Sequence, residues 1–323
     1  MAKVKNFKTI FPAVSVPLND DFSINEAEFR VYLRWIKSFY GKGIEGLVCN
    51  GHTGEITGLT RAERKRVVEI CAEECGDVMT IISGVNCENT QESIEMAAEA
   101  KAAGADGILL MPPHMWLRFG MNPDAPFQYI KDVAEGADID IIIHLYPATS
   151  KAFYPVETLI KMCKEIDHVK CIKMGTRVTS IYEHDVRLLR QECPDISLIT
   201  CHDETLCVSW FPGMDGALIG FAGCVPELIC PAREVFANPD KHTLKEAQDW
   251  SDRIYHISQA IYGGGQPSGE AHARLKEALY QRGIFSNAFM RKPVLPLNQE
   301  EKDWVALGLE RSKLPKVDME QYK

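Results

Sequence analysis

Short apolar segments rich in β-branched residues alternate along most of this chain with longer amphipathic segments. Eight short segments have the composition of strands: Thr9–Val16, Gly46–Asn50, Thr80–Val85, Gly107–Met111, Asp140–Tyr146, Val169–Lys173, Ser197–Cys201 and Gly216–Gly220. Strands that alternate with helices form parallel sheets, and eight such units form a (β/α)8 TIM barrel. An open, doubly wound sheet normally has a G-x-G-x-x-G turn after its first strand, and no such turn occurs here. We therefore predict a closed α/β barrel.

Helix start signals support this register. Ser23 with Glu26, and Thr60 with Glu63, fit the S/T-x-x-E capping box, in which two backbone donors are satisfied reciprocally. The stretch 89–104 has helical spacing of its apolar residues and ends at Gly104, just before the strand that begins at Gly107. These signals predict helices between the strands.

The length of 323 residues exceeds the roughly 250 residues of one barrel. We predict that residues 1–235 form the barrel and that residues 236–323 form a C-terminal helical subdomain packed on it. This subdomain should hold two or three helices, interrupted by glycines 263–265 and by the Pro293 and Pro296 pair. The tail 316–323 is expected to be loosely held.

Composition excludes several functional classes. The formal net charge of −9 disfavours nucleic acid as a partner. The eleven cysteines are scattered and odd in number, as expected for free thiols in a reducing compartment. Cys71 and Cys75 lack a second ligand pair at useful spacing, so we expect no metal site. There is no apolar segment of leader or membrane-span length, so we expect a cytoplasmic protein without a membrane partner.

One lysine at a strand end is the strongest candidate for chemistry. Functional groups of such barrels lie at the carboxyl ends of the strands, and alternation places Lys173 on the same face as Cys171, with Lys170 opposite. An amine inside an apolar barrel loses its proton more readily and can then attack a ketone. The alternatives are a structural lysine paired with a carboxylate, or a register that points Lys173 outward.

Two neighbouring strand ends carry further candidates. Tyr146 ends the fifth predicted strand, where a phenol could move protons, although a tyrosine there could equally be a packing residue. After the second strand, Gly51-His52-Thr53-Gly54-Glu55 forms a glycine-flanked turn with free backbone N–H groups and a hydroxyl, suited to bind a carboxylate.

Together these elements resemble the superfamily of N-acetylneuraminate lyase and dihydrodipicolinate synthase. The turn at residues 51–55, Tyr146, Lys173 and Asp215-Gly216 occur at the matching strands, as do Gly104–Gly107 before strand four and Pro112-Pro113 after it. The resemblance covers most of the barrel.

The resemblance implies a class I, Schiff-base-forming lyase without an external cofactor. Lys173 would form the covalent Schiff base with a 2-oxo acid such as pyruvate, and Tyr146 would relay protons. Thr53 and Gly54 would bind the substrate carboxylate, with Leu218 and Gly220 of strand eight completing the substrate site. Glu55 would brace the turn, and the family commonly forms homotetramers built as dimers of dimers.

The chain also departs from the family pattern. His52 stands where the family usually has a hydroxyl residue, and its imidazole could rebuild the proton relay or leave it lost. Asp203 and Glu204 resemble an acidic pair that contacts sugar hydroxyls in sialic acid lyases, but either could instead cap the following helix. The roles of His144 and His202 stay open, with a satisfied core histidine favoured for His144.

Other departures bear on the substrate. Dihydrodipicolinate synthases have a tyrosine after the strand-four prolines and an arginine beyond the strand-five tyrosine, whereas this chain has Trp116 and, as its only nearby cation, Lys151. Trp116 and Phe119 could line a pocket for an aromatic acid or lie at a subunit interface.

We therefore predict an aldolase or dehydratase acting on a 2-oxo acid, either pyruvate-releasing or a deoxy-sugar acid. The alternatives are 4-hydroxy-tetrahydrodipicolinate synthase, a hydratase-aldolase of aromatic oxo acids, an oxo-acid-binding regulatory protein, and an open-sheet oxidoreductase.

Overall fold

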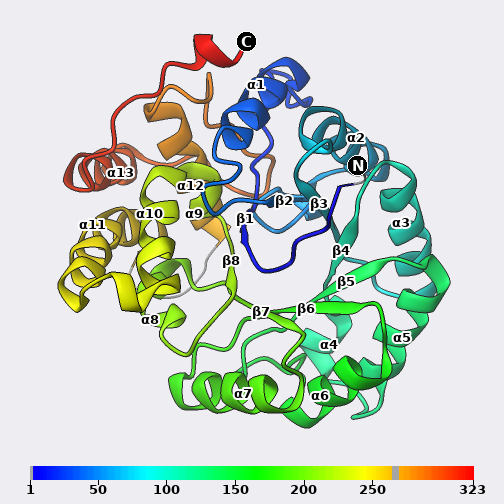
Figure 1. Cartoon of the computed structure of the whole chain (residues 1–323). Helices are drawn as coiled ribbons and strands as arrows, with labels where there is room; N and C mark the ends of the chain where they lie inside the picture. The colour runs from blue at the N-terminus through cyan, green and yellow to red at the C-terminus, as the bar shows by residue number, and fades with distance from the viewer. Residues whose placement is uncertain (1–2, 264–268) are drawn as a thin grey trace.

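The computed structural model of this chain describes residues 3–263 and 269–323. Eight parallel strands lie at the centre with helices around them (Figure 1). The strands are β1 (Ile10–Pro12), β2 (Gly46–Cys49), β3 (Thr80–Val85), β4 (Gly107–Leu110), β5 (Asp140–His144), β6 (Val169–Met174), β7 (Ser197–Thr200) and β8 (Gly216–Ile219). Strand β1 pairs with β8, and a bridge between Ala13 and Val48 joins β1 to β2. The predicted (β/α)8 barrel is confirmed.

Seven longer helices follow the strands on the outside of the barrel: α1 (Glu26–Lys37), α2 (Arg61–Cys75), α3 (Thr90–Ala102), α5 (Ala125–Ala137), α6 (Val156–Glu165), α7 (Thr179–Glu192) and α10 (Pro226–Ala237). Short helices lie in the loops: α4 (His114–Phe119), α8 (Leu206–Trp210) and α9 (Phe221–Cys224). Of these short helices, α4 contributes two side chains, His114 and Leu117, to the cavity at the carboxyl ends of the strands.

One of the two predicted capping boxes is confirmed. Thr60 and Glu63 cap α2 reciprocally, and α3 begins after Asn89 as expected. The box at Ser23 was wrong: α1 begins after Asn25, whose side chain accepts a hydrogen bond from the Glu28 N–H. The Ser23 hydroxyl instead donates to Asp21 in the preceding turn, at 2.6 Å. To act as the cap, the Ser23 oxygen would have to accept a hydrogen bond from a helix N–H, but it accepts instead from the Asn19 side-chain amide at 3.0 Å.

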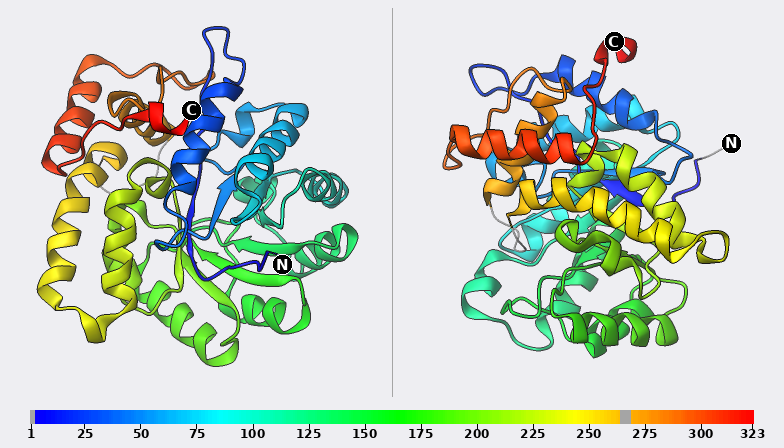
Figure 2. Two further views of the ribbon diagram at one scale, coloured as in Figure 1. Left: turned by 45° about the horizontal axis from the view of Figure 1, so that its top comes forward. Right: turned by 90° about the vertical axis from the view of Figure 1, so that its left-hand side faces the viewer.

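The C-terminal segment contains three helices in its described part: α11 (Leu244–Tyr262), α12 (Gly269–Gln281) and α13 (Gln299–Arg311). Figure 2 shows them stacked against one side of the barrel. Gly263 ends α11 with a left-handed backbone, whereas Gly264 and Gly265 fall outside the described residues. The proposed boundary at residue 235 falls near the end of α10, and the division into two domains stays a prediction.

The tail is docked, contrary to our expectation. The Val317 N–H donates to the Arg282 carbonyl at 2.8 Å, and Val317 and Tyr322 pack against the core. The last residues form a short 3-10 turn, Met319–Tyr322, which lies against α1. Apolar side chains at the end of the chain therefore hold it in place.

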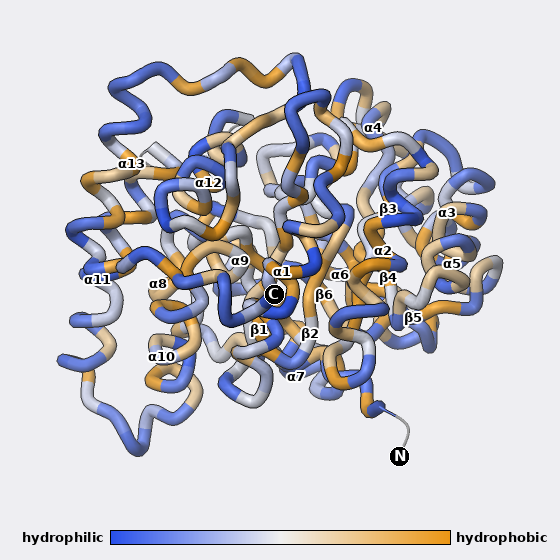
Figure 3. The backbone as a smooth tube through the Cα atoms, turned by 90° about the horizontal axis from the view of Figure 1, so that it is seen from above, coloured by the Kyte–Doolittle hydropathy of each residue, from blue (hydrophilic) through white to orange (hydrophobic). Residues whose placement is uncertain are grey.

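The interior is apolar from the barrel to the inner faces of the helices, and hydrophilic positions gather on the outer helices (Figure 3). All eleven cysteines are free and ten are buried, so the prediction of unpaired thiols is confirmed. Within the two described ranges, no helix is both long and apolar enough to span a bilayer.

Candidate active site

A cavity of about 420 Å³ opens at the carboxyl ends of the strands. Seven of the nine site residues predicted from the sequence line it: His52, Thr53, Tyr146, Lys173, Asp203, Leu218 and Gly220. The other two, Gly54 and Glu204, do not line it. Strands distant in sequence thus bring most of the predicted residues together.

Lys173 enters the cavity from β6. Cys171 is buried, Lys170 is exposed on the opposite face, and Lys173 pairs laterally with His144 of β5. No described residue forms an ion pair or a hydrogen bond with the Lys173 amine. Burial lowers the pKa of this amine, and the nearby Arg177 lowers it further, against the opposing effects of Cys201 and Asp203. Neither the outward orientation nor the structural ion pair occurs among the described residues.

Tyr146 and His52 form a contact pair beside this lysine. The Tyr146 hydroxyl lies 3.3 Å from Nε2 of His52. Burial raises the pKa of Tyr146. Burial, with a smaller contribution from Lys173, lowers the pKa of His52 to about 3. Both groups are therefore neutral near pH 7, and a proton can pass between a phenol and a neutral imidazole.

The turn after β2 is built for close packing. A Cβ atom at Gly54 would lie 3.0 Å from the Val14 carbonyl oxygen, so glycine is needed there for packing against the chain after β1. Glu55 has a left-handed backbone and forms a buried ion pair with Lys276 of α12. This pair braces the turn from the C-terminal helices and leaves Thr53 facing the cavity.

Asp203 and Glu204, the acidic pair after β7, have different hydrogen-bond and ion-pair partners. Asp203 accepts a hydrogen bond from the Phe221 N–H at 2.8 Å and pairs with the Tyr262 hydroxyl. Burial raises the pKa of Asp203 to about 7. Glu204 forms an ion pair with Arg177, with 2.5 Å between Oε1 and Nε. Neither carboxylate caps helix α8, which begins without a side-chain cap.

Four residues had open roles after the sequence analysis. His144 lines the cavity, whereas His202 lies outside it with its ring 4.8 Å from that of Tyr182. Trp116 packs edge-on against Tyr129 and does not line the cavity. Phe119 is 74% exposed and is also absent from the cavity wall.

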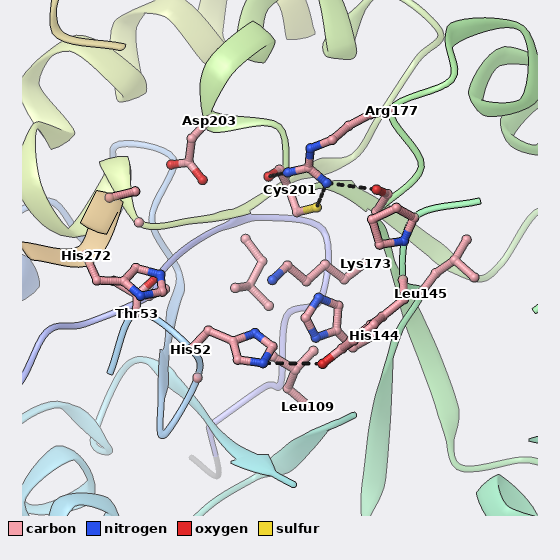
Figure 4. Close-up of a pocket in the computed structure, with 18 of the residues that line it drawn as sticks. His52, Thr53, Leu109, His144, Leu145, Lys173, Arg177, Cys201, Asp203 and His272 are labelled. Carbon is pink, nitrogen blue, oxygen red and sulfur yellow. Dashed lines mark hydrogen bonds between the residues drawn. The ribbon is translucent and has the colours of Figure 1, made fainter. Parts of the chain in front are cut away.

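Sequence reasoning missed several polar residues of the wall, among them Arg177, Tyr262 and His272. Arg177 follows Lys173 by four residues, and inspection of the loop after β6 could have found it. Tyr262 and His272 come from α11 and α12, outside the barrel, and no strand-end pattern points to them. Figure 4 shows His272 beside Thr53, with Lys173 near the centre of the cavity. Among the described residues, no cluster of three or more metal-ligating side chains is present.

Known proteins resemble this sequence over nearly the whole chain. The model of the dihydrodipicolinate synthetase family matches residues 6–311. A 4-hydroxy-tetrahydrodipicolinate synthase of Bartonella bacilliformis is 26% identical over 311 residues, covering 96% of this chain and 99% of the relative. An uncharacterised DapA-like lyase of Thermofilum pendens is 24% identical over 292 residues, covering 90% and 92%.

Solved structures agree on the fold. The prophage protein YagE of E. coli K12, a member of the dihydrodipicolinic acid synthase family solved in complex with pyruvate, has a TM-score of 0.84 at 19% identity, with 95% of this chain and 99% of that one covered. Dihydrodipicolinate synthase of Aquifex aeolicus has a TM-score of 0.83 at 18% identity, with 97% and 100% covered. With the match over residues 6–311, the chain belongs to the dihydrodipicolinate synthetase family, whose members are aldolase-type lyases.

Proposed function

We propose that this protein is a lyase that forms a Schiff base between Lys173 and a 2-oxo acid. The observation that carries the proposal is an amine with a lowered pKa that lines the cavity without an ion-pair partner among the described residues. A lysine kept for structure would need a carboxylate to offset its burial. A lysine kept for nucleophilic attack needs a free lone pair instead.

The surrounding groups suit a small anionic ketone. Thr53 offers a hydroxyl at the cavity wall, on a turn fixed by the pair of Glu55 and Lys276. Arg177 also lines the cavity but is paired with Glu204, so we expect the Thr53 hydroxyl and the backbone N–H groups of its turn to bind the substrate carboxylate. Solved neighbours that contain pyruvate, such as YagE, support the choice of a 2-oxo acid.

The proposed chemistry needs no external cofactor. The amine adds to the ketone and water is lost, which gives an iminium that accepts electrons from a neighbouring bond. Either a C–C bond breaks in a retro-aldol step or a hydroxyl group leaves after proton removal. Tyr146, in contact with His52, is placed to move the proton.

Two observations favour a pyruvate-releasing or deoxy-sugar acid over the alternatives. Lys151, the only cation just after β5 in the sequence, donates to the Arg118 carbonyl and does not line the cavity, so the aldehyde-binding arginine of dihydrodipicolinate synthases has no counterpart at that position. Trp116 and Phe119 are absent from the wall, which removes the support for an aromatic oxo acid.

The test is intact mass after borohydride reduction with pyruvate and with a panel of 4-hydroxy-2-oxo acids. We expect a reduced adduct on the wild type and none on Lys173→Ala. Lys170→Ala is the matched control, because it removes an exposed lysine from the opposite face of the same strand. If no oxo acid adds to the wild type, the Schiff-base mechanism is wrong, and a protein that only binds oxo acids becomes the better hypothesis.

A further inference from the structure

His144 occupies an unusual place for a buried histidine. It is the lateral partner of Lys173 in the pairing of β5 with β6, so the two side chains enter the cavity next to each other. Its ring lies 4.9 Å from the ring of Tyr146 and 5.5 Å from that of His52. Figure 4 shows His144 and His52 on the same side of Lys173.

The ring of His144 is not satisfied as a core histidine would be. The side chain is 7% exposed, and its Nδ1 atom has no hydrogen-bond partner among the described residues. Buried polar atoms are nearly always paired in folded proteins, so an unpaired one in an active-site wall points to a partner supplied by the substrate. Burial, with Lys173 and His52 adding to it, lowers the pKa of His144, so the imidazole is neutral at rest and holds a proton only transiently, as a shuttle requires.

We propose that His144 is a second catalytic residue, which transfers the proton of the Lys173 amine during Schiff-base formation, while the pair of Tyr146 and His52 serves the later proton transfers at substrate carbon and hydroxyl. The proposal rests on the proposed function. It assigns two of the histidines of the wall to two successive steps by their neighbours: His144 adjoins the nucleophile, and His52 contacts the phenol.

The lone pair of the Lys173 amine forms the C–N bond to the ketone carbon, and the carbonyl π electrons move to oxygen. The proton lost by nitrogen passes to His144 and then to that oxygen, which gives a neutral carbinolamine. One further proton, from solvent, lets the oxygen leave as water while the nitrogen lone pair completes the iminium.

The experiment separates the two steps with pyruvate as the only probe. Borohydride trapping on a time course gives the rate of iminium formation. Exchange of the pyruvate methyl protons in D₂O, followed by NMR, gives the rate of enamine formation. The first two variants are His144→Leu and His144→Asn, of which the asparagine keeps a hydrogen-bonding group but cannot shuttle the proton. The third variant is His52→Asn. His202→Leu is the matched control, because it removes a buried imidazole outside the cavity.

We expect both His144 variants to slow iminium formation at least tenfold, because general acid–base catalysis typically contributes about 10²–10⁴-fold to a rate. The melting temperatures of both variants should show that they are folded. His52→Asn should trap pyruvate at the wild-type rate but slow the exchange, and His202→Leu should change neither rate. Wild-type trapping by a folded His144→Asn, or equal slowing of trapping by His52→Asn, would overturn the assignment. If the wild type forms no adduct, the proposed function itself fails and this inference falls with it.

Discussion

The buried pair of Lys276 and Glu55 links the C-terminal helices to the turn that carries His52 and Thr53. The two side chains are only 2% and 10% exposed, and the Lys276 amine also donates to the Phe289 carbonyl at 2.8 Å. Lys276→Met keeps most of the aliphatic chain but leaves the Glu55 carboxylate buried without its cation. Breaking such a pair on one side costs about 3–5 kcal/mol of unfolding free energy.

For a chain of 323 residues, that loss corresponds to a fall in melting temperature of roughly 4–7 °C. Thermal and urea unfolding measure it, and trapping of pyruvate reports on the turn. We expect Lys276→Met to bind the oxo acid more weakly. The double variant Lys276→Met/Glu55→Gln should recover about 2 kcal/mol or more, because it removes the isolated charge.

Lys245→Met is the control, since Lys245 pairs with Asp249 on the exposed face of α11, and no measurable change is expected there. If Lys276→Met unfolds at the wild-type midpoint and traps pyruvate with unchanged affinity, the pair does not brace the turn, and this account of the C-terminal helices is wrong.

Further predictions concern packing, acid stability and assembly. A Cβ atom at Gly220 would lie 2.8 Å from Leu275 and 3.3 Å from the Thr53 hydroxyl, so Gly220→Ala should raise the KM for the oxo acid and cost about 1–3 kcal/mol in urea unfolding. A wild-type KM would contradict this. Burial lowers the pKa of His202 to about 3. Between that value and its unfolded pKa near 6.5, the unfolded chain binds the extra proton, so stability falls as pH falls from 6.5 to 4. His202→Leu should lose less stability over this range, and parallel pH curves for the two proteins would refute the assignment. Finally, the family resemblance implies a homotetramer, so light scattering should give the mass of four 36.2-kDa chains, and a monomer mass would exclude a dimer of dimers.

The sequence was most informative where a rule of local geometry applied. Alternation along β6 placed Lys173 correctly in the cavity, because the two faces of a strand differ at every residue. The same reasoning placed Tyr146 at the cavity, although β5 itself ends at His144. Strand positions were therefore predictable even where exact strand ends were not.

Contacts between distant segments were not predictable. Nothing near His272 in the sequence indicates that α12 packs beside the turn after β2, since that arrangement depends on tertiary packing of the whole C-terminal segment. At Ser23, a second candidate cap lay two residues further on at Asn25, and the serine oxygen was already occupied as an acceptor by the Asn19 side-chain amide. Glu204 was taken for a cavity residue because its partner, Arg177, was not considered.

The wall formed by Tyr262 and His272 has a consequence for synthesis of the protein. Domains generally fold as the chain leaves the ribosome, amino-terminal parts first. All eight strands, and with them Lys173, emerge before α12 does. A nascent chain whose eight strands had already formed the barrel would still lack His272, and with it part of the cavity wall. The protein should therefore acquire activity only after α12 has been synthesised, and products that terminate before α12 should be inert.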